Sequence, residues 1–324
     1  MKKIFFLFFA LFIVTVLFSA NAAFAQEKYP SKPIHFIVPM TAGGGTDRVA
    51  RALAESLKNH LPEPVLVENV PGAGSVVGMS KLHTSRPDGY TLAIVGGYLI
   101  TTTLQGMAKF PATDFTLVAR TSGEAFCLTV PADSKYRSLT DIIAASKADP
   151  DKITLANAGT GALTHLASVA INQNAGAKFR FIPFEGGAKE LTAVLGAHVD
   201  AGVFSLSEVL GHSVPGGKLR TLAVFSEKRS PLLPDVPALQ ELGIKGIPEG
   251  PWQGVAAPKG LPDDIRNTLI EAIGKAVQEP SWKEFMAKFG YADRFLPGKD
   301  FEKFFESERQ VFEKLIKAVE QQPK

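Results

Sequence analysis

The residues best suited to chemistry form the glycine-rich stretch Thr41-Ala42-Gly43-Gly44-Gly45-Thr46-Asp47, which follows the apolar run 34–38. Behind it, apolar residues recur at helical spacing over 49–57, so a strand leads through a glycine loop into a helix. Glycines let a ligand approach the backbone, and the first N–H groups of a helix have no internal partner. With the helix dipole, these donors suit a carboxylate or a phosphate. The same residues also suit a tight turn before a capped helix, with no ligand.

Two more glycine corners lie between a strand-like run and a helical pattern. The second is Gly159-Thr160-Gly161-Ala162, after Asn157, and the third is Pro183–Ala188. Ligands of open α/β sheets bind outside the carboxyl ends of the strands. The sequence therefore predicts a ligand held between two lobes, bound by residues of these corners and their neighbours: Met40, Thr41, Ala42, Gly43, Gly44, Thr46, Asp47, Tyr98, Gly159, Thr160, Gly161, Ala162, His165, Phe184, Gly186 and Phe204.

Individual residues of this set have competing interpretations. Thr46 and Asp47 suit helix caps, although Thr46 also suits a ligand contact. An aspartate beside a bound carboxylate would repel it unless turned to the backbone, so we expect Asp47 to hold the loop. His165 fits a buried structural histidine better than a ligand contact. Tyr98 is a pocket candidate, whereas Met40 and Phe184 suit the pocket and the core equally.

The order of the elements predicts an α/β fold with mainly parallel sheets. Helical patterns alternate with strand-like runs, and a Ser-x-x-Asp capping pattern begins the helix at Ser138. The strands are expected at 34–38, 65–68, 90–95, 115–120, 126–130, 153–157, 179–183, 201–204 and 219–224. The helices are expected at 74–85, 138–147, 163–175, 188–195, 262–278 and 299–318.

The amino-terminus has the three parts of a secretory signal peptide. Lys2 and Lys3 precede the apolar stretch 4–18, and Ala23-Phe24-Ala25 forms a cleavage site. The apolar stretch is shorter than the ~20 residues that a membrane-spanning helix needs, which disfavours a retained anchor. We expect residues 1–25 to be removed after Ala25 and the protein to be exported to the periplasm.

The composition of the remaining chain excludes several classes of function. Its 33 basic and 32 acidic side chains include no dense basic run, which argues against nucleic acid as a partner. Cys127 is the only cysteine, so there is no intramolecular disulfide, and its apolar neighbours favour an inert buried thiol over a reactive one. The six histidines lack metal-ligand spacing, and neither a hydrolase elbow nor a Walker pattern occurs. We therefore expect no catalytic residue, no metal and no cofactor.

Many short motifs along the chain, in order, resemble the Bug family, the TctC-like extracytoplasmic solute receptors of tripartite tricarboxylate transporters. The resemblance covers the whole chain after residue 25. Its motifs are Tyr29–Ile34, Pro39–Asp47, Glu68–Gly74, Pro87–Leu92, Gly159-x-Gly161 with His165-Leu166, Pro183-Phe184-x-Gly186, Gly217–Arg220, Lys228–Pro231, Pro234–Pro237, Trp252-x-Gly254, Ala257-Pro258 and Gly260–Pro262.

The resemblance implies a periplasmic binding protein of the type II class, with two lobes joined by two crossing strands and a ligand between them. Lobe 1 would comprise residues 26–124 and 225–324, and lobe 2 residues 125–224. The lobes would close by a hinge at 124–126 and 224–226. The ligand would be a small organic carboxylate, held by backbone amides, hydroxyls and water, and a monomeric receptor would deliver it to membrane subunits of the transporter.

Departures from the family pattern bear on the ligand. Ala162 stands where the family often has serine, and Phe184-Glu185 stands where it often has tyrosine and lysine. The second lobe is thus less polar than usual. Because an unpaired buried polar group is costly, this favours an aromatic acid or a monocarboxylate over citrate.

Two other functions remain open. A secreted dinucleotide-dependent oxidoreductase is suggested by Gly43-x-Gly45 after a strand and by Glu68 at the end of the next one. The missing third glycine, the export signal and the lack of an acid–base pair argue against it. A receptor that feeds a sensor kinase would use the same fold, and pocket chemistry alone does not separate it from a transport receptor.

Overall fold

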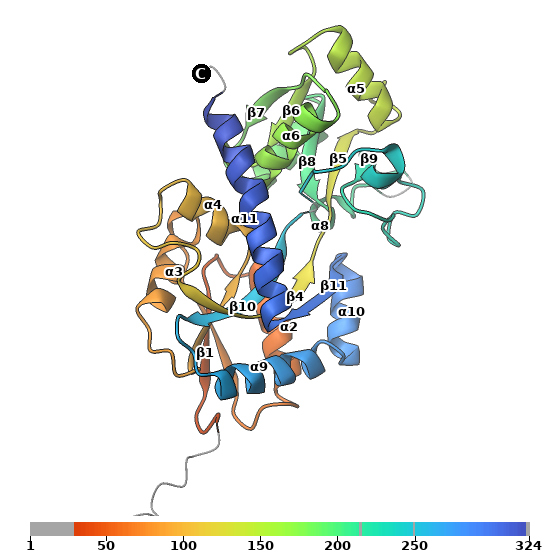
Figure 1. Ribbon diagram of the computed structural model, residues 1–324. Coiled ribbons are helices and arrows are strands. Elements are labelled where there is room, and N and C mark those ends of the chain that lie inside the picture. Colours follow the sequence, from red (N-terminus) through yellow and green to blue (C-terminus); the bar gives the residue numbers. More distant parts are fainter. Residues whose placement is uncertain (1–28, 214–215, 249, 322–324) are drawn as a thin grey trace, which may run out of the picture.

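The computed structural model describes residues 29–213, 216–248 and 250–321, which form two β-sheets with helices on both faces of each (Figure 1). The predicted signal peptide, residues 1–25, lies outside the described residues. The first sheet has the order β11(Ala292–Pro297)-β4(Phe115–Gly123)-β10(Trp252–Pro258)-β3(Thr91–Val95)-β1(Ile34–Val38)-β2(Val65–Asn69). The second has the order β7(Arg180–Pro183)-β6(Thr154–Asn157)-β8(Ala201–Ser205)-β5(Phe126–Pro131)-β9(Leu219–Val224).

The sheets are mixed, so the prediction of mainly parallel sheets is wrong. Strand β1 is parallel to β2 and β3, and β6 is parallel to β7 and β8. In contrast, β10 is antiparallel to β3 and β4, β11 to β4, and β5 to β8 and β9. The chain leaves the first sheet after β4 and returns through β10, which enters between β3 and β4 in the opposite direction to both.

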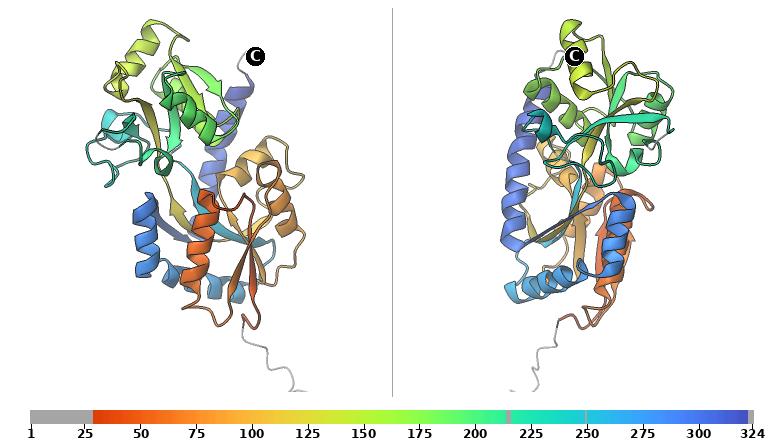
Figure 2. Two further views of the ribbon diagram at one scale, coloured as in Figure 1. Left: turned by 180° about the vertical axis from the view of Figure 1, so that it is seen from behind. Right: turned by 90° about the vertical axis from the view of Figure 1, so that its right-hand side faces the viewer.

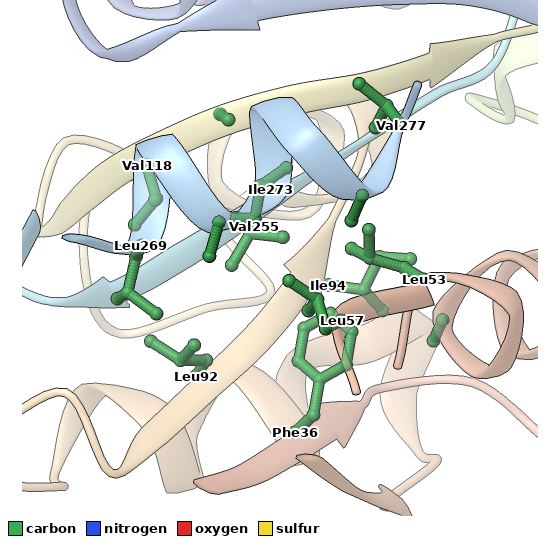
Figure 3. Close-up of a cluster of buried hydrophobic side chains, with 14 of the residues drawn as sticks. Phe36, Leu53, Leu57, Leu92, Ile94, Val118, Val255, Leu269, Ile273 and Val277 are labelled. Atoms are coloured by element: carbon green, nitrogen blue, oxygen red, sulfur yellow. The ribbon is translucent and has the colours of Figure 1, made fainter. Parts of the chain in front are cut away.

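One face of the first sheet is covered by α2(Gly45–Leu57), α9(Asp263–Ala276) and α10(Pro280–Phe289). The apolar spacing of α2 places Leu53 and Leu57 against the sheet, where they meet Phe36 of β1 and Ile273 of α9 (Figure 3). Burying each such side chain contributes ~1.5–3 kcal/mol to the stability of the fold. This packing fixes the position of α2 on the sheet. The amino-terminus of α2 is thereby held at the carboxyl edge of β1.

The opposite face carries α3(Val76–His83), preceded by the 3₁₀ turn η1(Ala73–Ser75), and α4(Gly97–Leu104). The long helix α11(Gly298–Glu320) lies on the same face and continues alongside the second sheet (Figures 1 and 2). There its Phe312 and Leu315 share a core with Leu166 and Val169 of α6(Leu163–Asn174). The two sheets are thus joined on the α11 side by packed apolar side chains.

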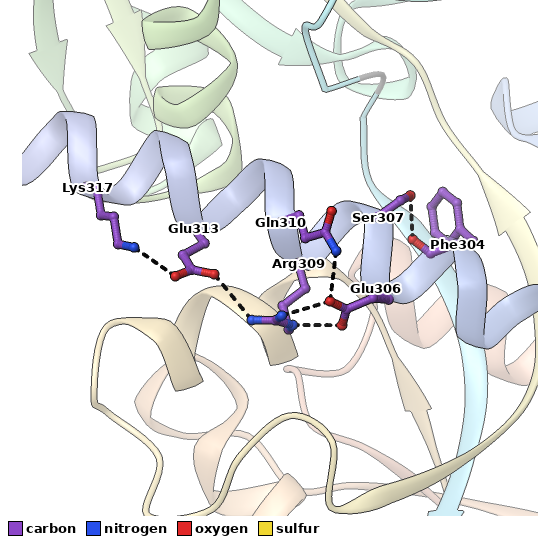
Figure 4. A network of polar contacts seen from close by, with 7 residues as sticks. All are labelled: Phe304, Glu306, Ser307, Arg309, Gln310, Glu313 and Lys317. Atoms are coloured by element: carbon purple, nitrogen blue, oxygen red, sulfur yellow. Dashed lines mark hydrogen bonds and ion pairs between the residues drawn. The ribbon is translucent and has the colours of Figure 1, made fainter.

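One flank of α11 carries a row of charged residues (Figure 4). Arg309 contacts Glu306 and Glu313, and Lys317 contacts Glu313. The hydrogen bond from Arg309, aided by Gln310, lowers the pKa of Glu306 to about 2. Pairs of this kind on an exposed helix contribute only ~0.2–0.5 kcal/mol each, so α11 depends mainly on its buried face.

The second sheet is covered by α5(Leu139–Ala148) and α6 on one face, and by α7(Gly187–Leu195) and α8(Leu206–Val209) on the other. The predicted capping pattern is confirmed, because Ser138 and Asp141 form both hydrogen bonds of a capping box at α5. Cys127 is buried in β5, as predicted, and burial raises the pKa of its thiol to about 12.

The segment between β9 and β10 packs mainly on the second sheet. Leu239 of η2(Leu239–Leu242) is buried in the α5–α6 core, and Ala238 bridges to Val224 of β9. The chain crosses back only at Gly250–Pro251, where the Glu124 N–H donates to the Pro251 carbonyl at 2.8 Å. We therefore propose a lobe 2 of 125–249, in place of 125–224, with a second crossing about 25 residues later than the sequence predicted.

No helix in the described part of the chain is both long enough and apolar enough to cross a bilayer.

Candidate functional site

The first glycine corner leaves the amino-terminus of α2 uncapped by any side chain. Gly44 is the cap residue, and the first hydrogen bond inside the helix joins Arg48 N–H to the Gly44 carbonyl at 3.0 Å. Thr46 and Asp47 lie in the first turn, so neither is the cap that the sequence suggested. The N–H groups of Gly45, Thr46 and Asp47 precede that first bond, as in an anion-binding helix terminus.

Asp47 ties the glycine loop to the rest of the fold. Its carboxylate accepts hydrogen bonds from Gly43 N–H at 2.8 Å, Arg51 Nε at 3.0 Å and Asn69 Nδ2 at 2.8 Å. Burial by itself would raise the pKa of Asp47, but these hydrogen bonds outweigh burial and hold the pKa below its ordinary value. The geometry agrees with a positioning role, in which Asp47 faces the loop backbone and Arg51 instead of a ligand.

Asp47→Ala should lower the free energy of unfolding by ~2 kcal/mol, the usual contribution of a hydrogen-bonded buried carboxylate. Because the folded-state pKa is depressed, this stabilisation is present at neutral pH and is lost as the pH falls below about 4 through the folded pKa. Urea unfolding at neutral and acidic pH measures both effects. Asp141→Ala, at the exposed cap of α5, is the control and should cost only ~1 kcal/mol. Equal losses in the two variants would contradict the role of Asp47.

The second glycine corner uses most of its own amides. Ala158 N–H donates to Thr164 Oγ1 at 2.9 Å, Gly159 N–H to Asn157 Oδ1 at 3.1 Å, and Gly161 N–H to His165 Nδ1 at 3.0 Å. This corner therefore offers fewer amides to a ligand than the sequence suggested. One buried donor is left: Asn157 Nδ2 has no partner within the described residues.

The other predicted site residues divide between loop surface and core. His165 is buried against Phe181, and burial lowers the pKa of its imidazole. Tyr98 donates its hydroxyl to the Ile94 carbonyl at 2.7 Å, and Phe204 is fully buried beside α7, so neither presents a free polar group or ring to a ligand. Met40 and Phe184 are half-buried against apolar cores, and Gly186 N–H donates to the Ala158 carbonyl at 3.3 Å. Thr41, Ala42, Gly43 and Thr160 are exposed residues.

A cavity of about 470 Å³ lies where the chain crosses between the sheets, and we call it the inter-sheet cavity. Its walls come mainly from the segment 225–232 after β9, and also from residues 123–125, Gly250, α8, and the turn between α10 and β11. None of the three glycine corners lines it. Its lining includes Glu124, Leu206, Phe225, Gly290 and Tyr291.

Tyr291 connects this cavity to the first glycine corner. Its ring is buried, a Cβ on Gly45 would lie 2.9 Å from Tyr291 Oη, and the hydroxyl also faces the side chains of Arg48 and Ser207. The hydroxyl therefore points to the uncapped start of α2. Burial raises the pKa of Tyr291, so the hydroxyl is a neutral donor at physiological pH.

Glu124 and Ser207 approach Tyr291 from the side of the second sheet, and we call the place where these residues and the start of α2 meet the junction. Glu124, at the end of the first crossing, accepts a hydrogen bond from Ser207 N–H at 2.6 Å, and burial raises the pKa of Glu124 to about 7. Arg48 faces Glu124 from α2 and donates to the Gly43 carbonyl at 3.0 Å. No sequence pattern indicated Tyr291, Glu124 or Ser207, because they lie far apart along the chain and meet only at the junction.

The family model of the tripartite tricarboxylate transporter family receptor matches residues 49–321. The chain belongs to this family. Its Bug relatives include the protein BugT of Bordetella pertussis, which is 34% identical over 288 residues, covering 86% of this chain and 88% of BugT.

Solved structures of the family share the fold. A TctC solute-binding protein from Polaromonas, solved without ligand, is 35% identical, with a TM-score of 0.80 over 90% of this chain and 99% of that one. Rpa4515 of R. palustris, solved with adipate, is 26% identical, with a TM-score of 0.76 over 90% of this chain and 98% of its own. The predicted family and the two-lobe, type II-like α/β class are confirmed.

Proposed function

We propose that this protein captures a small organic carboxylate between its two lobes in the periplasm and delivers it to the membrane subunits of a tripartite tricarboxylate transporter. The observation that carries the proposal is the uncapped amino-terminus of α2, at which the buried hydroxyl of Tyr291 points. An anion at this position receives several N–H donors, the favourable end of the helix dipole and a neutral hydroxyl.

The relatives support the same class of ligand. Rpa4515 was solved with adipate, a dicarboxylate, and the family is named for tricarboxylate transport. We assign Glu124, Arg48 and Tyr291 to holding the two lobes and the ligand in place. The proposal is therefore one of capture and includes no catalytic step. Export with cleavage after Ala25 and action as a monomer are parts of the proposal.

A thermal-shift screen of residues 26–324 tests the binding function. The panel contains mono-, di- and tricarboxylates, aromatic acids, amino acids, nucleotides and metal cations. A ligand present at a hundred times its Kd stabilises the folded state by ~2.7 kcal/mol, which is a readily measured shift in Tm. We expect shifts with one class of carboxylate. Shifts with nucleotides or cations and none with acids would contradict the proposal.

Delivery to a transporter needs a separate measurement. Cells that lack this chain should lose uptake of the acid identified in the screen and regain it when the chain is restored. Normal uptake without the chain would contradict delivery and leave the binding function standing.

A further inference from the structure

Glu124 is the residue at which the two crossings meet. It follows β4 directly and is buried. Its N–H donates to the Pro251 carbonyl at 2.8 Å, and a Cβ on Gly250 would lie 2.0 Å from its carbonyl oxygen, so its backbone packs against the second crossing. The Glu124 side chain therefore extends from a fixed point between the two sheets.

The Glu124 carboxyl lies between α8 and α2. On the side of the second sheet, its Oε1 accepts a hydrogen bond from Ser207 N–H at 2.6 Å. On the side of the first sheet, Arg48 of α2 faces the carboxyl, and the Tyr291 hydroxyl faces both Arg48 and Ser207. Arg48 also donates to the Gly43 carbonyl at 3.0 Å, within the first glycine corner. The carboxyl thus adjoins the two side chains that border the start of α2.

The Glu124 carboxyl changes its charge near neutral pH. Burial disfavours the carboxylate more strongly than the hydrogen bonds from Ser207 favour it, so the pKa of Glu124 is raised to about 7. The charge of Glu208 adds to this rise, and the charge of Arg48 opposes it. Both the neutral carboxyl and the carboxylate are therefore populated near pH 7, at a point that adjoins the proposed anion site.

The other charged and titratable groups that act on Glu124 come from several elements. From α2, α8, β5 and the residue before β11, within the described chain, they are Arg48, Glu208, Cys127 and Tyr291. The wall of the inter-sheet cavity, which Glu124 shares, adds Arg120, Glu227, Lys228, Arg229 and Arg294. Burial raises the pKa of Tyr291 and that of Cys127, so both stay neutral near pH 7. Burial also raises the pKa of Glu208, and the experiment must therefore separate Glu208 from Glu124.

We infer that Glu124 is a positioning residue that acts through Arg48 on the charge at the start of α2 and thereby couples carboxylate binding to the uptake of a proton. The inference rests on the proposed function, because it assumes that the ligand carboxylate binds at the start of α2. While Glu124 is neutral, nothing from Glu124 offsets the charge of Arg48, which attracts an anion. When Glu124 ionises, its charge offsets that of Arg48 and repels the ligand.

The reverse effect follows from linkage. A bound carboxylate disfavours the ionised form of Glu124, so binding raises the pKa of Glu124, and a proton enters from solution. The affinity for carboxylates should therefore be highest below about pH 7 and should fall as the pH rises through the pKa of Glu124.

Calorimetric titration of residues 26–324 at pH 6 and at pH 8.5 tests the coupling. Adipate and benzoate are the first probes, and the acid with the largest shift in the thermal screen replaces them if neither binds. Ordinary carboxylic acids are ionised across this range, so the probe itself hardly titrates. The Kd of the wild type should rise about tenfold from the lower to the higher pH, the effect of one charge close to a partly buried site.

Glu124→Gln retains an acceptor for Ser207 N–H and cannot ionise. Its Kd should differ by less than about twofold between the two pH values, and at the higher pH it should bind about tenfold more tightly than the wild type. A purely structural role for Glu124 would instead weaken binding at every pH. Glu208→Gln is the matched control, because it removes a neighbouring carboxyl whose pKa is also raised, and it should keep the rise in Kd.

Proton uptake is a second measurement, and it needs no variant. Binding enthalpies of the wild type at pH 7.5 in HEPES and in Tris, which differ in ionisation enthalpy, give the number of protons exchanged. We expect uptake of about half a proton per ligand, as a tenfold coupling requires close to the pKa of Glu124. Proton release, no exchange, a Kd independent of pH, or an unaltered profile in Glu124→Gln would overturn the inference and leave the binding function standing. If no acid of the panel binds at either pH, the proposed function fails, and the inference fails with it.

Discussion

Gly44→Phe should weaken carboxylate binding about a hundredfold, the value of losing about two hydrogen bonds to a charged group. Gly44 has ordinary extended backbone angles (φ −71°, ψ 172°), and the nearest atom to a Cβ there is the Thr41 carbonyl oxygen at 3.5 Å. The fold therefore accepts a side chain at this position, and the free energy of unfolding should change by less than about 1 kcal/mol. The ring would instead cover the N–H groups at the start of α2. Calorimetric titration with the acid found in the screen measures the loss.

Gly211→Phe is the matched control for this variant. A Cβ on Gly211 would meet no atom within 4 Å, so this position also accepts a side chain, but it lies beyond the end of α8 and belongs to none of the glycine corners. We expect its affinity to match the wild type. Full affinity in Gly44→Phe would remove the first glycine corner from the binding site.

Gly250→Ala should lower the free energy of unfolding by ~3 kcal/mol or more, at the upper end of the range for single substitutions. A Cβ on Gly250 would lie 2.0 Å from the Glu124 carbonyl oxygen and 2.7 Å from Phe126 N. Both are backbone atoms of the first crossing, so no side-chain rotation relieves the contact. The two crossings would have to separate, which also breaks the hydrogen bond between Glu124 N–H and the Pro251 carbonyl.

Gly260→Ala separates this steric effect from the general cost of replacing glycine. Gly260 has φ +88°, and nothing lies within 4 Å of its Cβ position, so alanine there should cost only ~1 kcal/mol. Urea unfolding of both variants gives the comparison. Equal costs at the two positions would show that the crossings tolerate separation and are not closely packed at Gly250.

Regular patterns in the sequence were sufficient for most of the fold. Apolar runs identified β1 to β9, and helical spacing identified α2, α3, α5, α6, α7, α9 and α11. The strand β10, with the sequence Trp252–Pro258, was missed because its glycine, alanines and proline lack the usual strand composition, although it lies at the centre of the first sheet. Helix α4 was missed because Ile100 and three threonines disfavour helix, and those threonine hydroxyls bond to carbonyls of the preceding turn.

The candidate site was less predictable than the fold. The uncapped glycine corner before α2 follows from local sequence, because a strand, three glycines and a helix are contiguous there. The amides of the second corner are occupied by side chains such as those of Thr164 and His165. The spacing of residues in the sequence does not specify the directions of these side chains. Tyr291, Glu124 and Ser207 meet through tertiary packing, so only the structure reveals them.

The packing of α11 determines where any relative rotation of the two sheets can take place. This helix contacts α4 and β4 of the first sheet and α6 of the second (Figure 2). Gln105, at the end of α4, donates to the Gly161 carbonyl at 3.0 Å. A rotation preserves these contacts only if its axis lies close to α11 and the crossings. Displacement grows with distance from the axis, so in such a rotation α4 and α6, which pack against α11, should move least. We therefore expect ligand exchange on the side of the molecule away from α11, where a small rotation changes the separation of the sheets most.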